Sequence, residues 1–331
     1  MTTPDAIQTV QALTTAYWAS RCLQIVAEVG VADVLGEAPR TAEALAADLG
    51  VHADPLGRIM RCLVNHGVFT LSDGLFSHNG ASRLLASDAR PPLRSMVRMM
   101  GLKAHWAAYG ELDETLRTGR PGIALATGGG FFEHLAAHPQ EGRLFDEAMT
   151  GKAFGQIGPA LAAYDFSRFR TIADIGGGAG HLLAAVLETA PGAEGVLFDL
   201  PAVAERAAER PHPRARYIGG DFFKDPIPSC DAYLLMTVLH DWSDAEAAQI
   251  LAAIRRSAPP GAKLLLLEAV IGLNSGGYDF AIDLDIEMLV MTTGRERTRD
   301  EWARLLAEGG FRLDRVIATS GMSAVIEGSP A

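Results

Sequence analysis

The sequence predicts an α/β protein, in which a doubly wound parallel sheet fills the C-terminal half and a smaller, mostly helical domain precedes it. Three observations predict this architecture. The chain has 331 residues, enough for about two domains of common size. Its second half alternates short apolar runs with amphipathic stretches, as parallel strands joined by helices do. Its first half has helical periodicity, interrupted by one short hairpin pattern.

Residues 1–95 are expected to form a winged-helix-like domain. Thr41 has the side chain of a helix N-cap, and Gly50 ends the Ala-rich stretch that follows it. Asp54 and Pro55 stand in the preferred order of a cap and a first helical residue. A Ser-Asp-Gly turn between two short apolar runs indicates a hairpin. The expected elements are helices over 8–36, 42–49 and from 54 to a stop at 67, then a hairpin of 68–71 with 75–77.

A winged-helix domain can bind DNA or join two protein chains. Only Arg58 and Arg61 lie on the helix that would enter DNA. The whole chain is acidic, with 29 Lys+Arg against 40 Asp+Glu and a formal charge of −11. Such a field repels phosphates and anionic lipids. We therefore expect a homodimerisation domain, with the helices of the apolar stretch 13–35 either exchanged between two copies or packed across their two-fold axis. We expect neither a nucleic-acid nor a membrane partner.

Cysteine usage and the absence of long apolar stretches predict a cytoplasmic protein. Cys22, Cys62 and Cys230 are far apart and follow neither a disulfide nor a zinc-binding spacing. Residues 1–5 lack the basic and apolar regions of a secretory signal. Charges and glycines interrupt every apolar stretch well short of the ~18 residues that span a bilayer.

Residues 96–165 are expected to be a helical connecting segment that contributes to a substrate pocket. The segment contains aromatic residues, a Gly-rich loop at 127–130 and a helix over 140–154. It lies between the two expected domains, where a ligand can be enclosed. Together with two methionines of the second half, the expected pocket residues are Trp106, Phe132, Phe145, Met149, Met288 and Met291.

Residues 166–331 show the alternation of strands and helices. In a doubly wound sheet, ligands bind beyond the carboxyl ends of the strands, so the chemistry is expected in the loops that follow them. The expected strands are 171–175, 195–198, 216–218, 232–236, 263–267, 311–318 and 323–326, and the expected helices are 180–188, 203–209, 245–257 and 299–309.

Three successive strand ends predict an adenosine site. The run 174–180, DIGGGAG, follows the first strand, but a tight turn without a ligand would use the same glycines. Asp199 ends the second strand, where a carboxylate can accept both ribose hydroxyls. Asp221 and Phe222 follow the third strand, where an acid and a ring can hold adenine. The run departs from the dinucleotide fingerprint at His181. A glycine turn, a ribose acid and an adenine acid without a pyrophosphate cradle together favour S-adenosylmethionine over NAD.

Five ordered motifs together give the chain a close resemblance to S-adenosylmethionine-dependent O-methyltransferases. The similarity is to plant caffeic acid and flavonoid enzymes and to bacterial natural-product enzymes, and it covers essentially the whole chain. It implies a class I methyltransferase, Rossmann-like fold, an obligate homodimer, no metal, and a phenolic or enolic hydroxyl as acceptor. S-adenosylhomocysteine would be the product. The motifs are 174–180 (DIGGGAG), 198–201 (FDLP), 220–223 (GDFF), 238–244 (VLHDWSD) and 296–298 (ERT).

The resemblance also implies roles for individual residues. His240 matches the general base, and Glu268 and Glu296 match two acids that orient it. Asp241 is expected at the substrate pocket. Met236 stands where many relatives have Lys or Arg near the cofactor, a departure that puts that contact in doubt. The expected cofactor-binding residues are Asp174, Gly176, Gly178, Asp199, Leu200, Asp221 and Phe222.

These residue types suit methyl transfer to oxygen. A phenol titrates near pH 10, so a neutral imidazole within hydrogen-bond reach can take its proton as the oxygen attacks. A carboxylate on the other ring nitrogen fixes the tautomer.

Asp283, Asp285 and Glu287 invite a metal interpretation, but positions i and i+2 of a helix face apart, so a partly solvated helix is expected.

Two functions other than O-methyl transfer also fit part of the sequence. Some relatives bind S-adenosylmethionine yet perform hydroxylation or decarboxylation without the base; His240 and its two acids count against this. A cofactor-sensing winged-helix regulator is the second rival. The acidic charge and the His-Asp-Trp loop count against it.

Overall fold

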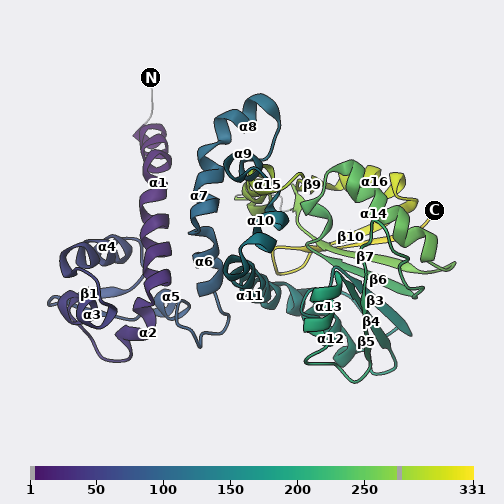
Figure 1. Cartoon of the computed structure of the whole chain (residues 1–331), viewed down its shortest axis with the longest axis horizontal. Coiled ribbons are helices and arrows are strands. Elements are labelled where there is room, and N and C mark those ends of the chain that lie inside the picture. The colour runs from purple at the N-terminus through teal and green to yellow at the C-terminus, as the bar shows by residue number, and fades with distance from the viewer. Residues whose placement is uncertain (1–3, 274–277) are drawn as a thin grey trace. The chain divides into compact units, whose positions relative to one another are not determined.

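The computed structural model describes residues 4–273 and 278–331, and its internal contacts divide the chain into two units (Figure 1). The first unit comprises Met1–Trp106 and His138–Lys152, and the second comprises Ala107–Ala137 and Ala153–Ala331. The segment 96–165 is thus divided between the units. The three domain ranges expected above stay a prediction.

Helix α3 of the first unit begins and ends where short-range signals place it, but two other helices differ from the expectation. Thr41 accepts the amide of Ala44 at 3.2 Å, and Gly50 is left-handed at φ 67°. Left-handed Gly30 divides the long helix expected over 8–36 into two. The helix expected from Asp54 begins instead at Ala53, after His52. The elements are α1 Pro4–Val29, α2 Val31–Leu35, α3 Ala42–Leu49, α4 Ala53–Asn65, α5 Gly80–Arg83 and α6 Arg94–Met100, with the first part of α11 Pro139–Ala163.

A two-residue turn joins the hairpin strands β1 Thr70–Ser72 and β2 Leu75–Ser77. Asp73 and Gly74 form this turn, both with positive φ, which suits the twist of paired strands. Phe76 of β2 is buried with side chains of the first four helices. Helices followed by a hairpin confirm the winged-helix arrangement.

One face of α1 is apolar and open to solvent. Its large side chains are between 50% exposed at Ile7 and 73% exposed at Leu13. A contiguous apolar surface of this kind is uncommon on a monomer. No helix of the described residues has the length and apolar character needed to cross a membrane. The exposed apolar residues of α1 are Ile7, Val10, Leu13, Tyr17 and Trp18.

The second unit is built on a seven-stranded sheet with the order β10-β11-β7-β6-β3-β4-β5. The five strands from β3 to β7 are parallel, but β11 runs antiparallel between β10 and β7. The expectation of a parallel sheet is therefore wrong at this edge. A short connection cannot carry the chain back across the sheet, so β11 returns antiparallel beside β10. The strands are β3 Thr171–Ile175, β4 Glu194–Asp199, β5 Ala215–Gly219, β6 Ala232–Met236, β7 Lys263–Glu268, β10 Phe311–Ile317 and β11 Ala324–Pro330.

Helices cover both faces of the sheet. Alternate strand residues point to opposite faces, so Tyr233 and Leu235 pack with α14 Asp244–Ser257 and α16 Arg299–Glu308. Leu234 packs in the other cluster, with α12 and α13. The doubly wound expectation is confirmed. The remaining helices are α7 Lys103–Gly110, α8 Leu112–Thr118, α9 Gly122–Thr127, α10 Phe131–Ala137, α12 His181–Thr189, α13 Pro201–Ala207 and α15 Phe280–Met291.

Candidate functional site

The glycine turn follows β3 at the carboxyl edge of the sheet. Gly176 has a φ of 69° and donates its amide to the Phe198 carbonyl at 2.8 Å. A Cβ on Gly176 would lie 3.0 Å from Val238. Gly178 also has positive φ, and nothing lies within 4 Å of where its Cβ would sit. The turn therefore needs glycine for its conformation, and at Gly178 it leaves backbone open to a ligand.

Asp199 lies at the end of β4 beside this turn. Its two carboxylate oxygens accept the amides of Gly178 at 2.8 Å and Leu200 at 2.7 Å. Each carboxylate oxygen can accept more than one hydrogen bond. An oriented carboxylate next to an uncovered glycine fits the ribose hydroxyls of an adenosine group.

Asp174 lies beneath the turn rather than on its open side. The residue is 1% exposed, and the Cβ of an alanine at Gly177 would lie 2.9 Å from its carboxyl group. Burial and the negative charge of Asp199 raise the pKa of Asp174 to about 7. The geometry favours support of the turn over contact with a ligand, and the expected cofactor contact stays a prediction.

Asp221 and Phe222 follow β5 at the same edge. Asp221 accepts the amide of Phe223 at 2.9 Å and pairs with Lys224 at 2.7 Å, and the Lys224 hydrogen bond lowers the pKa of Asp221. The ring of Phe222 meets Trp242 edge to face at 5.7 Å. An ionised acid beside a fixed aromatic ring has the chemistry that the adenine site needs.

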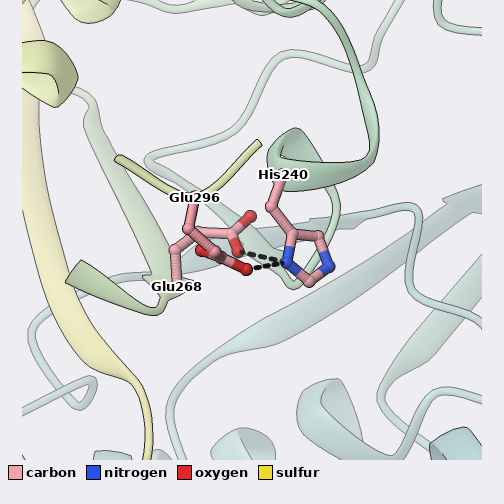
Figure 2. Close-up of side chains that lie close together, drawn as sticks. All are labelled: His240, Glu268 and Glu296. Carbon is pink, nitrogen blue, oxygen red and sulfur yellow. Dashed lines mark hydrogen bonds and ion pairs between the residues drawn. The ribbon is translucent and has the colours of Figure 1, made fainter. Parts of the chain in front are cut away.

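His240 occupies a short 3₁₀ turn, η1 Leu239–Asp241, just after β6. Its side chain is buried and faces two buried carboxyl groups, as Figure 2 shows. Nδ1 lies 2.6 Å from Oε1 of Glu296 and 3.8 Å from Oε2 of Glu268. Nε2 lies 3.6 Å from Oδ1 of Asp241. Glu296 therefore makes the hydrogen bond that orients the ring.

Glu268 acts on the backbone of the same turn. It ends β7, and its Oε1 accepts the amides of Val238 at 3.0 Å and Leu239 at 2.9 Å. The two acids meet because β8 Val270–Ile271 pairs with β9 Arg297–Thr298. This pairing joins the segments that follow Glu268 and Glu296. The expected convergence of His240 and both acids is thus present in the geometry.

The charges around His240 strongly favour its protonated form. Burial by itself lowers the pKa of the imidazole, but Glu268, Asp241 and Glu296 outweigh burial and raise the pKa to about 9. Burial raises the pKa of Glu268 to about 7. Nδ1 is engaged by Glu296, so Nε2 is the nitrogen that would accept a proton once the ring is neutral.

The same three residues could surround a metal ion, because His240, Glu268 and Glu296 offer ligand atoms within 4.8 Å of one another. The 2.6 Å contact between Nδ1 and Oε1 has the length of a charge-assisted hydrogen bond. A hydrogen bond therefore accounts for the close approach of His240 and Glu296. The acids of α15 accept hydrogen bonds from separate partners. Asp283 accepts the hydroxyl of Tyr278, and Glu287 accepts the hydroxyl of Tyr109. Asp285 accepts the amide of Glu296.

The expected substrate-pocket residues fall in both units. Phe132 stacks on Trp242 with ring centroids 6.3 Å apart, and Met288 and Met291 are buried on α15. Asp241 adjoins His240. These four lie in the second unit with the site. Trp106, Phe145 and Met149 lie in the first, where Trp106 donates to Gln24 and the other two pack near Leu144, so their place in a pocket stays a prediction.

Two residues beside the base received no role from the sequence. Arg297 is 1% exposed and binds backbone of the His240 turn, and a Cβ on Gly294 would collide with that turn. Arg297 lies within the motif 296–298, but the motif gave no role for it, and only its burial in the structure indicates one. Gly294 carries no sequence signal, because close backbone approach has no local pattern.

Comparison with known proteins identifies the family. Residues 109–312 match an O-methyltransferase domain, and residues 11–88 match an O-methyltransferase dimerisation domain. The chain is 36% identical to phenazine O-methyltransferase PhzM of Lysobacter antibioticus over 322 residues, 96% of this chain and 94% of that one. It is 37% identical to 8-amino-8-demethylriboflavin N,N-dimethyltransferase of Streptomyces davaonensis over 318 residues, 92% of this chain and 90% of that enzyme.

The fold is similar to that of a solved O-methyltransferase that holds two small molecules. An O-methyltransferase from neocarzinostatin biosynthesis, in complex with S-adenosylmethionine and 2-hydroxy-5-methyl naphthoic acid, superposes with a TM-score of 0.82 at 29% identity, covering 95% of this chain and 96% of that one. The two matched domains together span most of the chain. The chain therefore belongs to the S-adenosylmethionine-dependent O-methyltransferase family and is an enzyme of that class.

Proposed function

We propose that this enzyme methylates a phenolic or enolic hydroxyl of a small aromatic or polyketide-like secondary metabolite, with His240 as the general base. The hydrogen bond between Nδ1 of His240 and Glu296, at 2.6 Å, is the observation that carries the proposal. It leaves Nε2 as the nitrogen that can accept a proton. One relative is a phenazine O-methyltransferase, and the structure of the neocarzinostatin enzyme holds 2-hydroxy-5-methyl naphthoic acid. Both support an aromatic acceptor.

The residues of the chain would divide the work of methyl transfer. When bound, S-adenosylmethionine supplies an electrophilic methyl group on a positively charged sulfur. Gly176, Gly178 and Asp199 would hold its ribose end, and Asp221 with Phe222 its adenine. His240 would take the hydroxyl proton on Nε2, while Glu296 stabilises the imidazolium that forms. The rest of the task is alignment of the acceptor oxygen with the methyl group.

A mass-shift screen tests the proposed acceptor class. Purified enzyme, labelled cofactor and a panel of phenols should give products heavier by one methyl group. Aromatic amines of matched shape form the comparison panel, because one relative is an N,N-dimethyltransferase. Methylation of amines alone would contradict the proposed hydroxyl acceptor, and hydroxylated or decarboxylated products would favour the rival chemistry.

The rate should rise with pH, because only a neutral imidazole can accept the acceptor's proton. The carboxylates around His240 raise its pKa from 6.5 to about 9. We therefore expect the ascending limb of the pH–rate profile, measured with a phenol that titrates near pH 10, to lie above pH 6.5 and toward 9. Affinity for S-adenosylhomocysteine, measured over the same range, is the control. A rate that stays flat across this range while affinity is constant would contradict base catalysis by His240.

Turnover should not need a metal ion. The His240–Glu296 hydrogen bond accounts for the approach of two of the three possible ligands, and the proposed reaction needs only a base and an aligned methyl group. The rate after exhaustive dialysis against EDTA should equal that of untreated enzyme. Loss of activity that Mg²⁺ restores would show that the three residues hold a metal.

The protein should be a homodimer in solution. The apolar face of α1 is exposed in the single chain, and residues 11–88 match a dimerisation domain. Covering this face with a second copy would remove it from water. Light scattering should give about twice the chain mass of 35.2 kDa. A Leu13→Glu variant should shift the distribution toward monomer, and a wild-type monomer at every concentration tested would refute the dimer.

A further inference from the structure

The segment of residues 293–297 approaches the His240 turn through Gly294, Glu296 and Arg297. Thr293 donates to Glu246 at 3.0 Å, which ties the segment to the start of α14. Glu296 binds the ring of His240, and its own amide donates to Asp285 at 2.8 Å. The segment then enters β9, where Arg297 pairs with Val270. It is therefore anchored on both sides of the base.

Arg297 holds the backbone on both sides of His240. Nη1 donates to the Leu239 carbonyl at 3.2 Å, and Nη2 donates to the Trp242 carbonyl at 3.1 Å. The guanidinium also pairs with Asp244 at 2.8 Å. Its central carbon lies 5.1 Å from the ring centroid of Trp302. A planar group with donors in fixed directions can hold these acceptors together, whereas an ammonium group cannot.

Gly294 sets how closely the segment approaches the turn. A Cβ at this position would lie 1.8 Å from the carbonyl oxygen of His240 and 2.6 Å from the amide nitrogen of Trp242. Both atoms are backbone, so neither can move aside without moving the turn. Any side chain at position 294 must displace the base or the segment that carries Glu296.

We propose that Arg297 and Gly294 are positioning residues that hold the imidazole of His240 in register with Glu296 and with the acceptor hydroxyl. This inference rests on the proposed role of His240. Neither residue takes part in proton transfer: Arg297 binds the turn through its carbonyls, and Gly294 admits the close approach. Small displacements of a catalytic group can reduce rates by about 10²-fold.

The test compares Arg297→Lys and Gly294→Ala with Arg214→Lys. Arg214 is also an arginine that donates to three backbone carbonyls, those of Leu187, Ala190 and Ala193, but at the end of α12. Arg297→Lys and Gly294→Ala should each lower kcat by about 10- to 100-fold while affinity for S-adenosylhomocysteine stays near wild type. Arg214→Lys should leave kcat unchanged. Arg297→Lys introduces no collision with backbone, so it serves if Gly294→Ala does not fold.

Proton NMR separates positioning from general loss of stability. The Nδ1 proton between His240 and Glu296 should give a far-downfield resonance in the wild type, assigned by its loss in His240→Gln. It should shift or broaden in the two test variants and persist in Arg214→Lys. An unchanged resonance in both test variants would overturn the proposal, whatever the rates. A displaced resonance with unchanged kcat would support the positioning but contradict base catalysis by His240.

Discussion

Replacing His240 by alanine should lower kcat by at least about 10²-fold on a phenol that titrates near pH 10. The variant lacks the nitrogen that would accept the hydroxyl proton, so the oxygen would attack while still protonated. Affinity for S-adenosylhomocysteine should stay near wild type, because Gly178 and Asp199 belong to the glycine turn and β4 rather than to the His240 turn. Steady-state kinetics and calorimetric titration of the same preparations measure both quantities.

The matched control is His212→Ala. His212 is a histidine of the same unit whose Nε2 pairs with Glu188 at 3.0 Å, just before β5, at the edge of the sheet opposite the site. Its loss should leave kcat unchanged. An acidic phenol, already ionised at neutral pH, should depend less on His240, and so should an aromatic amine. If His240→Ala keeps more than half of the wild-type kcat on the weakly acidic phenol, alignment alone carries the reaction.

Replacing Asp199 by alanine should weaken binding of S-adenosylhomocysteine at least about tenfold, since each charge-assisted hydrogen bond to a ribose hydroxyl contributes roughly 1.5–3 kcal/mol. The variant also frees the Gly178 and Leu200 amides, which the carboxylate accepts in the wild type. Calorimetric titration gives the dissociation constant directly. The effect on kcat at saturating cofactor should be much smaller than that of His240→Ala.

Asp231→Ala controls for the structural part of this change. Asp231 likewise accepts two backbone amides, those of Arg170 at 3.1 Å and Thr171 at 3.0 Å, but at the amino end of the strands. It should lower thermal stability about as much as Asp199→Ala without changing affinity. Equal affinities of Asp199→Ala and wild type would mean that the ribose lies elsewhere.

The parts of the fold that follow from local chemistry could be predicted from the sequence. The Thr41 cap, the Gly50 end and the alternation of strands and helices from Thr171 onward each depend on neighbours in the chain. The antiparallel position of β11 could not, because strand order is decided by packing across the sheet. Helix α4 begins after His52, two residues before the cap that the order Asp54–Pro55 predicts, although His52 makes no side-chain cap hydrogen bond.

The site was predictable as a set of residues but not as a set of contacts. The resemblance to O-methyltransferases implied that Glu268 and Glu296 orient His240, but it did not tell which of the two acids binds the ring. That choice depends on the pairing of β8 with β9, and strands of two residues have no periodicity to detect. The role of Gly294 was hidden for the same reason, since its contact is with backbone far away in the sequence.

The pairing of Val270 with Arg297 has a consequence for how acceptor choice can diverge among relatives. The pairing brings the two ends of the stretch 272–292, which includes α15, close together. Glu268 lies before this stretch and Glu296 lies after it. Met288 and Met291 lie inside this stretch. A chimeric enzyme that exchanges this stretch would keep Glu268 and Glu296, but it must also keep an acceptor in the place of Asp285, which binds the Glu296 amide at 2.8 Å.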